Sequence, residues 1–177
     1  MTTARQITKI EANQENGTVS AMWTQFDGDG EMPGFKRPGR LGFTSIAFAD
    51  ALDKFFDVAL DRLSVSGIWD SVYRKLSISL KWNAEAGADV VLSLQGYPEP
   101  GNSARIATVK LSPFTYYPAG HASRDDSLAT VSGRYATEAE AKALEELLAC
   151  TERWLDGESS QGNLFSLNAV EEEAIAA

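Results

Sequence analysis

The clearest pattern in the chain is an alternation of apolar and polar residues between positions 71 and 113. From Leu76 to Trp82 every second residue is apolar, while Lys75 and Lys81 fall on the other, polar side. Side chains point to opposite faces along a strand, so this run predicts a half-buried strand with a basic outer face. Two further alternating runs follow, each after a turn that contains glycine. The short connections predict three consecutive antiparallel strands.

A hairpin is predicted at the start of the chain. The segments Arg5–Asn13 and Thr18–Phe26 have the character of strands, and Asn16-Gly17 lies between them. Asn-Gly is preferred in tight hairpin turns because both central residues need positive φ. Both faces of the second strand carry apolar side chains, which leaves two alternatives open. The hairpin is covered on both sides within the chain, or it lies at a contact with a second copy in a homodimer.

The segment Asp27–Gly42 is rich in glycine and proline and predicts a connecting loop, with a short third strand near Arg40–Phe43. Its first part is acidic, as in calcium-binding loops. An EF-hand, however, needs glycine at its sixth position and glutamate at its twelfth, where this chain has Met32 and Pro38. We therefore expect no metal site here, and the chain as a whole predicts no cofactor.

Two helices are expected on the apolar side of the sheet. Thr44 or Ser45 can cap a helix that runs to about Leu63, with apolar residues at helical spacing. Thr137 begins a capping box with a glutamate three residues later, and this predicts a second helix to about Leu155.

These elements predict an α+β fold, with an antiparallel sheet of six to eight strands and two amphipathic helices packed on it. The expected order is β-β-(β)-α-β-β-β-(β)-α, with Ser127–Tyr135 as the last bracketed strand. Residues 1–157 are expected to form one domain, and residues 158–177 a flexible acidic tail.

Charge is distributed unevenly along the 177 residues, whose net charge is −9. Residues 71–137 carry seven basic and five acidic side chains, whereas residues 138–177 carry two basic and ten acidic ones. Overall acidity argues against a general duplex-DNA-binding protein. The N-terminal segment is polar and no run approaches the roughly 20 apolar residues of a membrane span, so we expect a cytoplasmic protein with no membrane partner.

The predicted element order contains a strands-then-helix unit twice. In this respect it resembles the Whirly group of single-stranded-DNA-binding folds, which duplicate a unit of four strands and a helix. The resemblance covers the chain to about Leu155 and concerns element order only. It is an analogy at the level of the fold, to a group whose members bind single-stranded DNA.

Basic residues on one strand face and in one loop predict a non-catalytic accessory protein that binds single-stranded nucleic acid, of the kind that a phage or mobile element encodes. Lysine and arginine neutralise phosphates, and neighbouring rings can stack on bases. The acidic tail can compete with the ligand for this face. The candidate binding residues are Lys36, Arg37, Arg40, Phe35, Phe43, Lys75, Lys81 and Lys110.

The acidic residues support an alternative. A row of aspartates along the polar side of the first expected helix predicts a protein-binding module or inhibitor. Such a module would mimic nucleic acid and dock on a basic surface of a host protein. The row consists of Asp50, Asp53, Asp57 and Asp61.

A third hypothesis is an enzyme that uses the segment His121–Asp126, which holds the chain's one histidine near a serine and two aspartates. No G-x-S-x-G or comparable context surrounds a serine, and triads are recognised by geometry. No catalytic residue is therefore predicted.

Overall fold

The computed structural model describes residues 4–27, 30–31, 34–63, 73–83, 87–96, 107–110, 113–118 and 135–157. The first half of the chain contains strands β1 (Ala4–Asn13), β2 (Thr18–Asp27), β3 (Gly30–Glu31) and β4 (Phe35–Arg40), a 3₁₀ helix (Leu41–Phe43) and helix α1 (Ile46–Leu63). The second half contains strands β5 (Tyr73–Asn83), β6 (Gly87–Gly96), β7 (Ala107–Lys110) and β8 (Phe114–Tyr116), and helix α2 (Glu138–Leu155).

The strands form one antiparallel sheet with the order β3-β2-β1-β5-β6-β7; β4 also pairs with β2, and β8 also pairs with β6. This confirms the predicted α+β class and the three antiparallel strands predicted between positions 71 and 113. Each half of the chain contributes strands and then one helix. The two halves meet where β1 pairs with β5.

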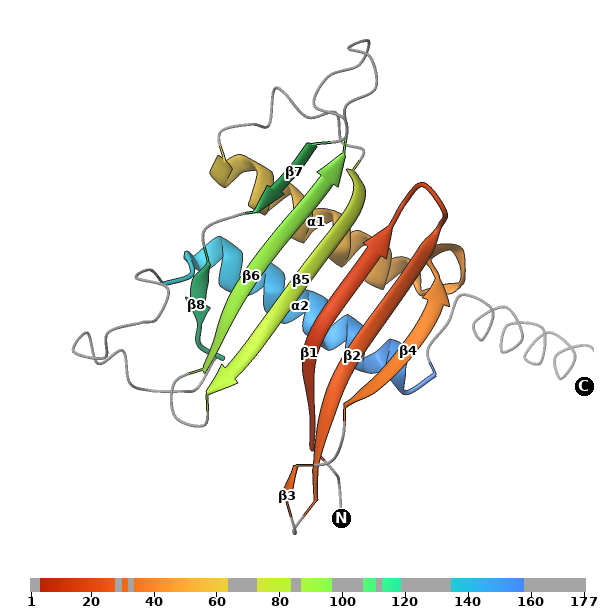
Figure 1. The fold of residues 1–177 in the computed structure, drawn as a ribbon, viewed down its shortest axis with the longest axis vertical. Coiled ribbons are helices and arrows are strands. Elements are labelled where there is room, and N and C mark those ends of the chain that lie inside the picture. Colours follow the sequence, from red (N-terminus) through yellow and green to blue (C-terminus); the bar gives the residue numbers. More distant parts are fainter. Residues whose placement is uncertain are drawn as a thin grey trace, which may run out of the picture.

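Both helices cover the same face of the sheet, behind the strands in Figure 1. Apolar side chains of the strands, such as Ile10, Ile78 and Leu94, are fully buried against this layer. The helices contribute Phe48 and Leu144 to the same core, together with the rest of the apolar stripe on each. Burial of these stripes is the main term that stabilises the two layers. No described helix covers the other face, which we call the open face.

A bulge in β1 keeps its apolar residues on the helix side. The register with β2 shifts between Ile7 and Lys9, which leaves Thr8 as the extra residue. Its hydroxyl donates to the carbonyl of Met22 at 3.2 Å. Because a bulge adds one residue, Ile7 and Ile10 face the core although they differ in parity.

The helix caps confirm the predicted starts. The Ser45 hydroxyl accepts from the backbone N–H of Phe48 at 3.2 Å, so Ser45 caps α1. Thr137 and Glu140 form both hydrogen bonds of the capping box at α2. After α2, Gly157 has a φ of 107°, a left-handed conformation that glycine adopts readily.

The prediction of a loop over Asp27–Gly42 was wrong at several positions, because Asp27 belongs to β2 and residues 30–31 form β3. Residues 35–40 form β4 on β2, and residues 41–43 form a 3₁₀ helix where the third strand was expected. Pro38 is tolerated because β4 is an edge strand. The first hairpin also differs, because it closes through the four residues 14–17, with Gly17 at a φ of 62°.

The segment Phe114–Tyr116 forms β8, an additional strand, with all three residues buried. Three residues are too few for an alternation to appear in the sequence. The predicted strand Ser127–Tyr135 lies outside the described residues except at its end, where Tyr135 bridges Thr115. The His121 segment and the acidic tail also lie outside them. Neither described helix is apolar enough over its length to cross a membrane.

Gly39 provides a test of the contact between β4 and α2. A Cβ at this position would lie 2.6 Å from Cζ2 of the buried Trp154 ring. We expect Gly39→Ala to lower the free energy of unfolding by about 1–3 kcal/mol, because overpacking displaces the strand or the ring. Urea denaturation followed by circular dichroism measures the change. Gly42→Ala is the control, since a Cβ there would meet nothing within 4 Å. Equal stability of the two variants would contradict the packing.

Candidate functional site

The strand register arranges the outward side chains of the open face in rows that cross the sheet. The middle row runs from β4 to β7 through Pro38, Ser20, Glu11, Ser77, Ser93 and Lys110. On one side of it lies the row Lys36, Met22, Lys9, Ser79 and Val91. On its other side lies the row Arg40, Thr18, Asn13, Lys75 and Gln95. Three serines and Glu11 therefore occupy the centre of the middle row, with lysine or arginine in the rows on both sides.

Two hollows follow the middle row. The first, of about 350 Å³, lies over β4, β2 and β1 and is lined among others by Lys36, Ser20 and Asn13. The second, of about 280 Å³, lies over β1, β5 and β6, with Ser77 and Ser93 in its lining. Glu11 and Lys75 line both hollows. The two hollows are therefore neighbours on the open face, and together we call them the basic groove.

Three lysines surround the one carboxylate of the groove. Lys9 Nζ lies 2.8 Å from the Glu11 carboxylate, and Lys75 Nζ lies 3.6 Å from it. A hydrogen bond from Lys9 lowers the pKa of Glu11, although partial burial opposes this, and the charges of Lys9, Lys75 and Lys36 lower it further. Glu11 is therefore ionised at neutral pH. Among the described residues, Lys36, Arg40 and Lys110 form no ion pair.

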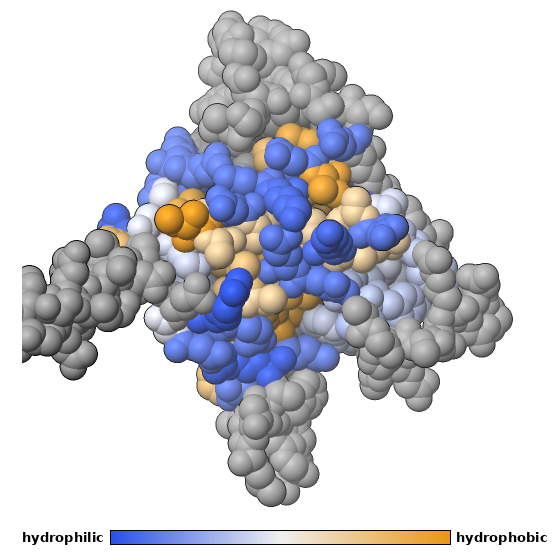
Figure 2. Space-filling view, turned by 180° about the vertical axis from the view of Figure 1, so that it is seen from behind, coloured by the Kyte–Doolittle hydropathy of each residue, from blue (hydrophilic) through white to orange (hydrophobic). Residues whose placement is uncertain are grey.

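The helix side of the molecule has the opposite charge. Helix α1 has four acidic and two basic residues, and α2 has five acidic and two basic residues. Hydrophilic residues extend over much of this side in Figure 2, between smaller apolar areas. The predicted row of Asp50, Asp53, Asp57 and Asp61 is exposed here. Partial burial raises the pKa of Asp53, and its neighbours Asp57 and Asp50 raise it further.

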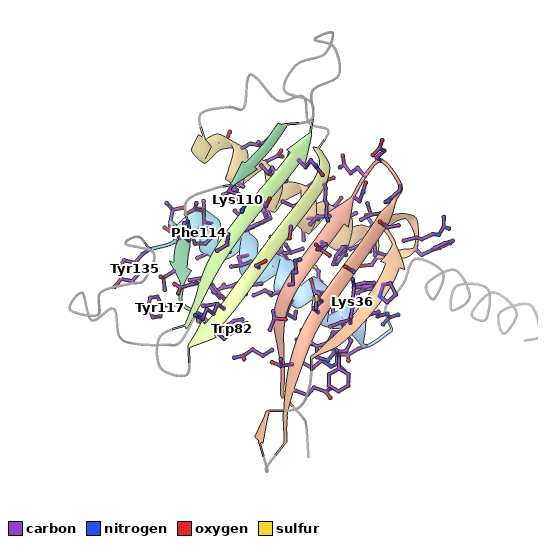
Figure 3. All side chains as sticks on the ribbon, in the orientation of Figure 1. Lys36, Trp82, Lys110, Phe114, Tyr117 and Tyr135 are labelled. Atoms are coloured by element: carbon purple, nitrogen blue, oxygen red, sulfur yellow. The ribbon has the colours of Figure 1, made fainter. Side chains whose placement is uncertain are left out.

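The structure brings together four of the predicted binding residues. Lys36, Arg40, Lys75 and Lys110 lie in or beside the basic groove. Lys36 and Lys110 come from strands at opposite edges of the sheet, β4 and β7 (Figure 3). Lys81 lies farther along β5, where its register partner is Asp89, and it does not line the groove.

The predicted rings lie away from the groove. Phe35 is on the opposite parity of β4 from Lys36, and its ring stacks on Trp23 with centroids 5.7 Å apart. Phe43 is 51% exposed on the 3₁₀ helix. Tyr117 and Tyr135 contact each other beyond the far edge of the sheet (Figure 3). None of the described residues that line the two hollows is aromatic.

Arg37 points to the helix side, unlike its neighbours. Its Nη1 donates to the carbonyl oxygens of Trp154 at 2.6 Å and Leu155 at 3.0 Å. The guanidinium also lies 5.2 Å from the centre of the Trp154 ring. Carbonyls in the last turn of a helix lack partners within the helix, and a cation there is favourable. Arg37 therefore attaches β4 to the end of α2.

Two groove residues, Lys9 and Glu11, were not among the predicted binding residues. Both follow the bulge, where they alternate with the buried Ile10 and Ala12. This short alternation is the sequence pattern that could have identified the two residues. The apolar Ile7 before the bulge obscures it, because Ile7 has the same odd-numbered parity as Lys9 and Glu11. The serines of the middle row could not be predicted from the sequence either, because only the strand register makes them neighbours.

No protein-family model, curated protein or solved structure matches this chain. The resemblance to the Whirly group therefore remains one of element order. Within the described ranges, no group of histidine, cysteine, aspartate and glutamate has the arrangement of a metal site.

The opposite orientations of Arg37 and Arg40 predict different consequences for their replacement. We expect Arg37→Met to lower the free energy of unfolding by about 1–3 kcal/mol, because the α2 carbonyls lose their charged donor. Arg40→Met is the matched control, and we expect it to change stability by about 0.5 kcal/mol or less. Urea denaturation of both variants measures the difference. Equal loss in the two variants would refute the assigned orientations.

Proposed function

We propose that this protein binds single-stranded nucleic acid in the basic groove, chiefly through the phosphates. The observation that carries the proposal is the combination of a hydroxyl-lined middle row with lysine and arginine on both sides, in a protein whose net charge is −9. Such clustering is unexpected on an acidic protein unless the ligand is an anion. Cationic side chains neutralise phosphates, and hydroxyl groups donate hydrogen bonds to their oxygens.

The dimensions of the groove favour a single strand. From β4 to β6 it crosses four inter-strand spacings, which is about 19 Å at about 4.8 Å each. This length suits a short stretch of backbone, on the order of 4 nucleotides. The hollows, of about 350 and 280 Å³, are pocket-sized and suit one chain of phosphates and sugars. A rigid duplex is too wide to enter them.

The lining of the groove supports recognition that is independent of sequence. Base readout on open sheets commonly uses exposed aromatic side chains, on which bases stack. The described lining has none, so phosphates and sugars are the groups that it suits. We therefore expect little difference between oligonucleotides of different base composition.

Fluorescence anisotropy of labelled oligonucleotides tests the proposal. We expect the single strand to bind more tightly than a duplex of the same length, and its affinity to fall steeply between about 50 and about 200 mM salt. Replacing Lys36 and Arg40 together by Gln should weaken binding about tenfold at the lower salt. The salt slope should decrease by about 1.4, which is about 0.7 for each phosphate that the variant no longer neutralises.

The matched control removes the same charge from the helix side. Lys54→Gln with Lys142→Gln alters exposed residues of α1 and α2 and should leave the salt slope unchanged. If both double variants lose affinity equally, binding is not located in the groove. If the wild-type protein binds no oligonucleotide at the lower salt, the proposal is wrong.

A second candidate function rests on the exposed aspartates of α1. These four carboxylates form no ion pair among the described residues, and Lys54, within the same helix, pairs with Glu146 instead. An unpaired acidic row favours a module that docks on a basic surface of another protein. Absence of oligonucleotide binding, together with capture of a basic partner that Asp53→Asn and Asp57→Asn abolish, would favour this function over the first.

A further inference from the structure

Glu11 lies in the path that the proposed ligand follows. It occupies the middle row between Ser20 of β2 and Ser77 of β5, and it lines both hollows. Every other described side chain that lines this row is neutral or basic. A carboxylate in the centre of a site for phosphates is unfavourable for the ligand, since like charges repel.

The carboxylate also engages the two lysines nearest to the centre. Lys9 Nζ is 2.8 Å from it, and Lys75 Nζ is 3.6 Å from it. The Glu11 side chain is only 22% exposed, whereas that of Lys75 is 45% exposed. Water therefore screens the carboxylate only in part, and the lysines have a partner in the absence of ligand.

We infer that Glu11 is an internal competitor for the phosphates of the ligand and that it makes the groove selective for chains of several phosphates. This inference rests on the proposed function. A phosphate reaches Lys9 and Lys75 only by displacing Glu11, which the fold keeps beside them at high effective concentration. Phosphates free in solution compete poorly with a tethered carboxylate.

A nucleic-acid strand overcomes this competition through its connectivity. Lys36, Arg40 and Lys110, which have no ion pair among the described residues, can hold the strand at the two ends of the groove. The intervening phosphates are then tethered beside Glu11 as well, so their effective concentration matches that of the carboxylate. Mononucleotides and inorganic phosphate lack this second attachment and should bind weakly.

The experiment compares Glu11→Gln with Asp57→Asn, which removes the same charge from an exposed position on α1. Anisotropy with a labelled single-stranded oligonucleotide measures affinity at several salt concentrations. We expect Glu11→Gln to tighten binding about tenfold and to leave the salt slope close to that of the wild-type protein, because the strand reaches Lys9 and Lys75 in both proteins but no longer has to displace a carboxylate. Asp57→Asn should change the affinity much less, since it acts only through long-range charge.

Competition by inorganic phosphate provides a second readout. We expect phosphate to displace the oligonucleotide from Glu11→Gln at a concentration about tenfold lower, relative to ionic-strength controls, than from the wild-type protein. A role of Glu11 in stability alone would change the unfolding transition and leave this concentration unaltered. Glu11→Ser continues the hydroxyl row and is a second variant, should Glu11→Gln fail to fold.

The outcomes separate the inference from the function on which it rests. If the wild-type protein binds the single strand and both Glu11 variants behave like Asp57→Asn, the inference is wrong and the proposed function stands. If neither the wild-type protein nor the variants bind at low salt, the proposed function fails, and the inference fails with it. Binding by the Glu11 variants but not by the wild-type protein would contradict both, because a connected strand would then be unable to displace Glu11.

Discussion

The apolar layer between the sheet and the helices requires that the buried side chains of β1 and those of β5 point to the same face of the sheet. Ile10 pairs with Ile78 at this junction, and both are fully buried. Without the bulge at Thr8, Ile7 and Ile10 would point to opposite faces. The same alternation places Lys9 and Lys75 on the open face. The basic groove is therefore a direct consequence of the packing that forms the core.

The end of α2 fixes one side of this sheet. Arg37 of β4 donates to the last carbonyls of the helix, and Arg5 of β1 reaches Glu152 at 3.3 Å and Asp156 at 2.7 Å. An edge strand that contains a proline and a glycine is intrinsically weak. Its attachment to α2 supplies the missing rigidity. Lys36, on the outer side of the same strand, thereby keeps a defined position in the groove.

Local patterns in the sequence were sufficient to predict the central strands, both helices and the capping box at Thr137. They failed at β4, since Pro38 and Gly39 favour a loop and their accommodation depends on Trp154, which is distant in sequence. For the binding surface, alternation in β5 identified Lys75, whereas the bulge concealed Lys9 and Glu11. Arg37 was grouped with Lys36 because no local signal showed that β4 is a strand, in which neighbouring side chains point to opposite faces.

The junction of β1 and β5 also has a consequence for the order of folding. Within each half, the paired strands are neighbours or near neighbours in sequence, but this junction joins strands that residues 14–72 separate. Closing such a long segment costs conformational entropy before its contacts form, so we expect the junction to assemble late. The groove crosses it, and the site is complete only when both halves are joined. A ligand that spans the groove would therefore stabilise the assembled protein against separation of its halves.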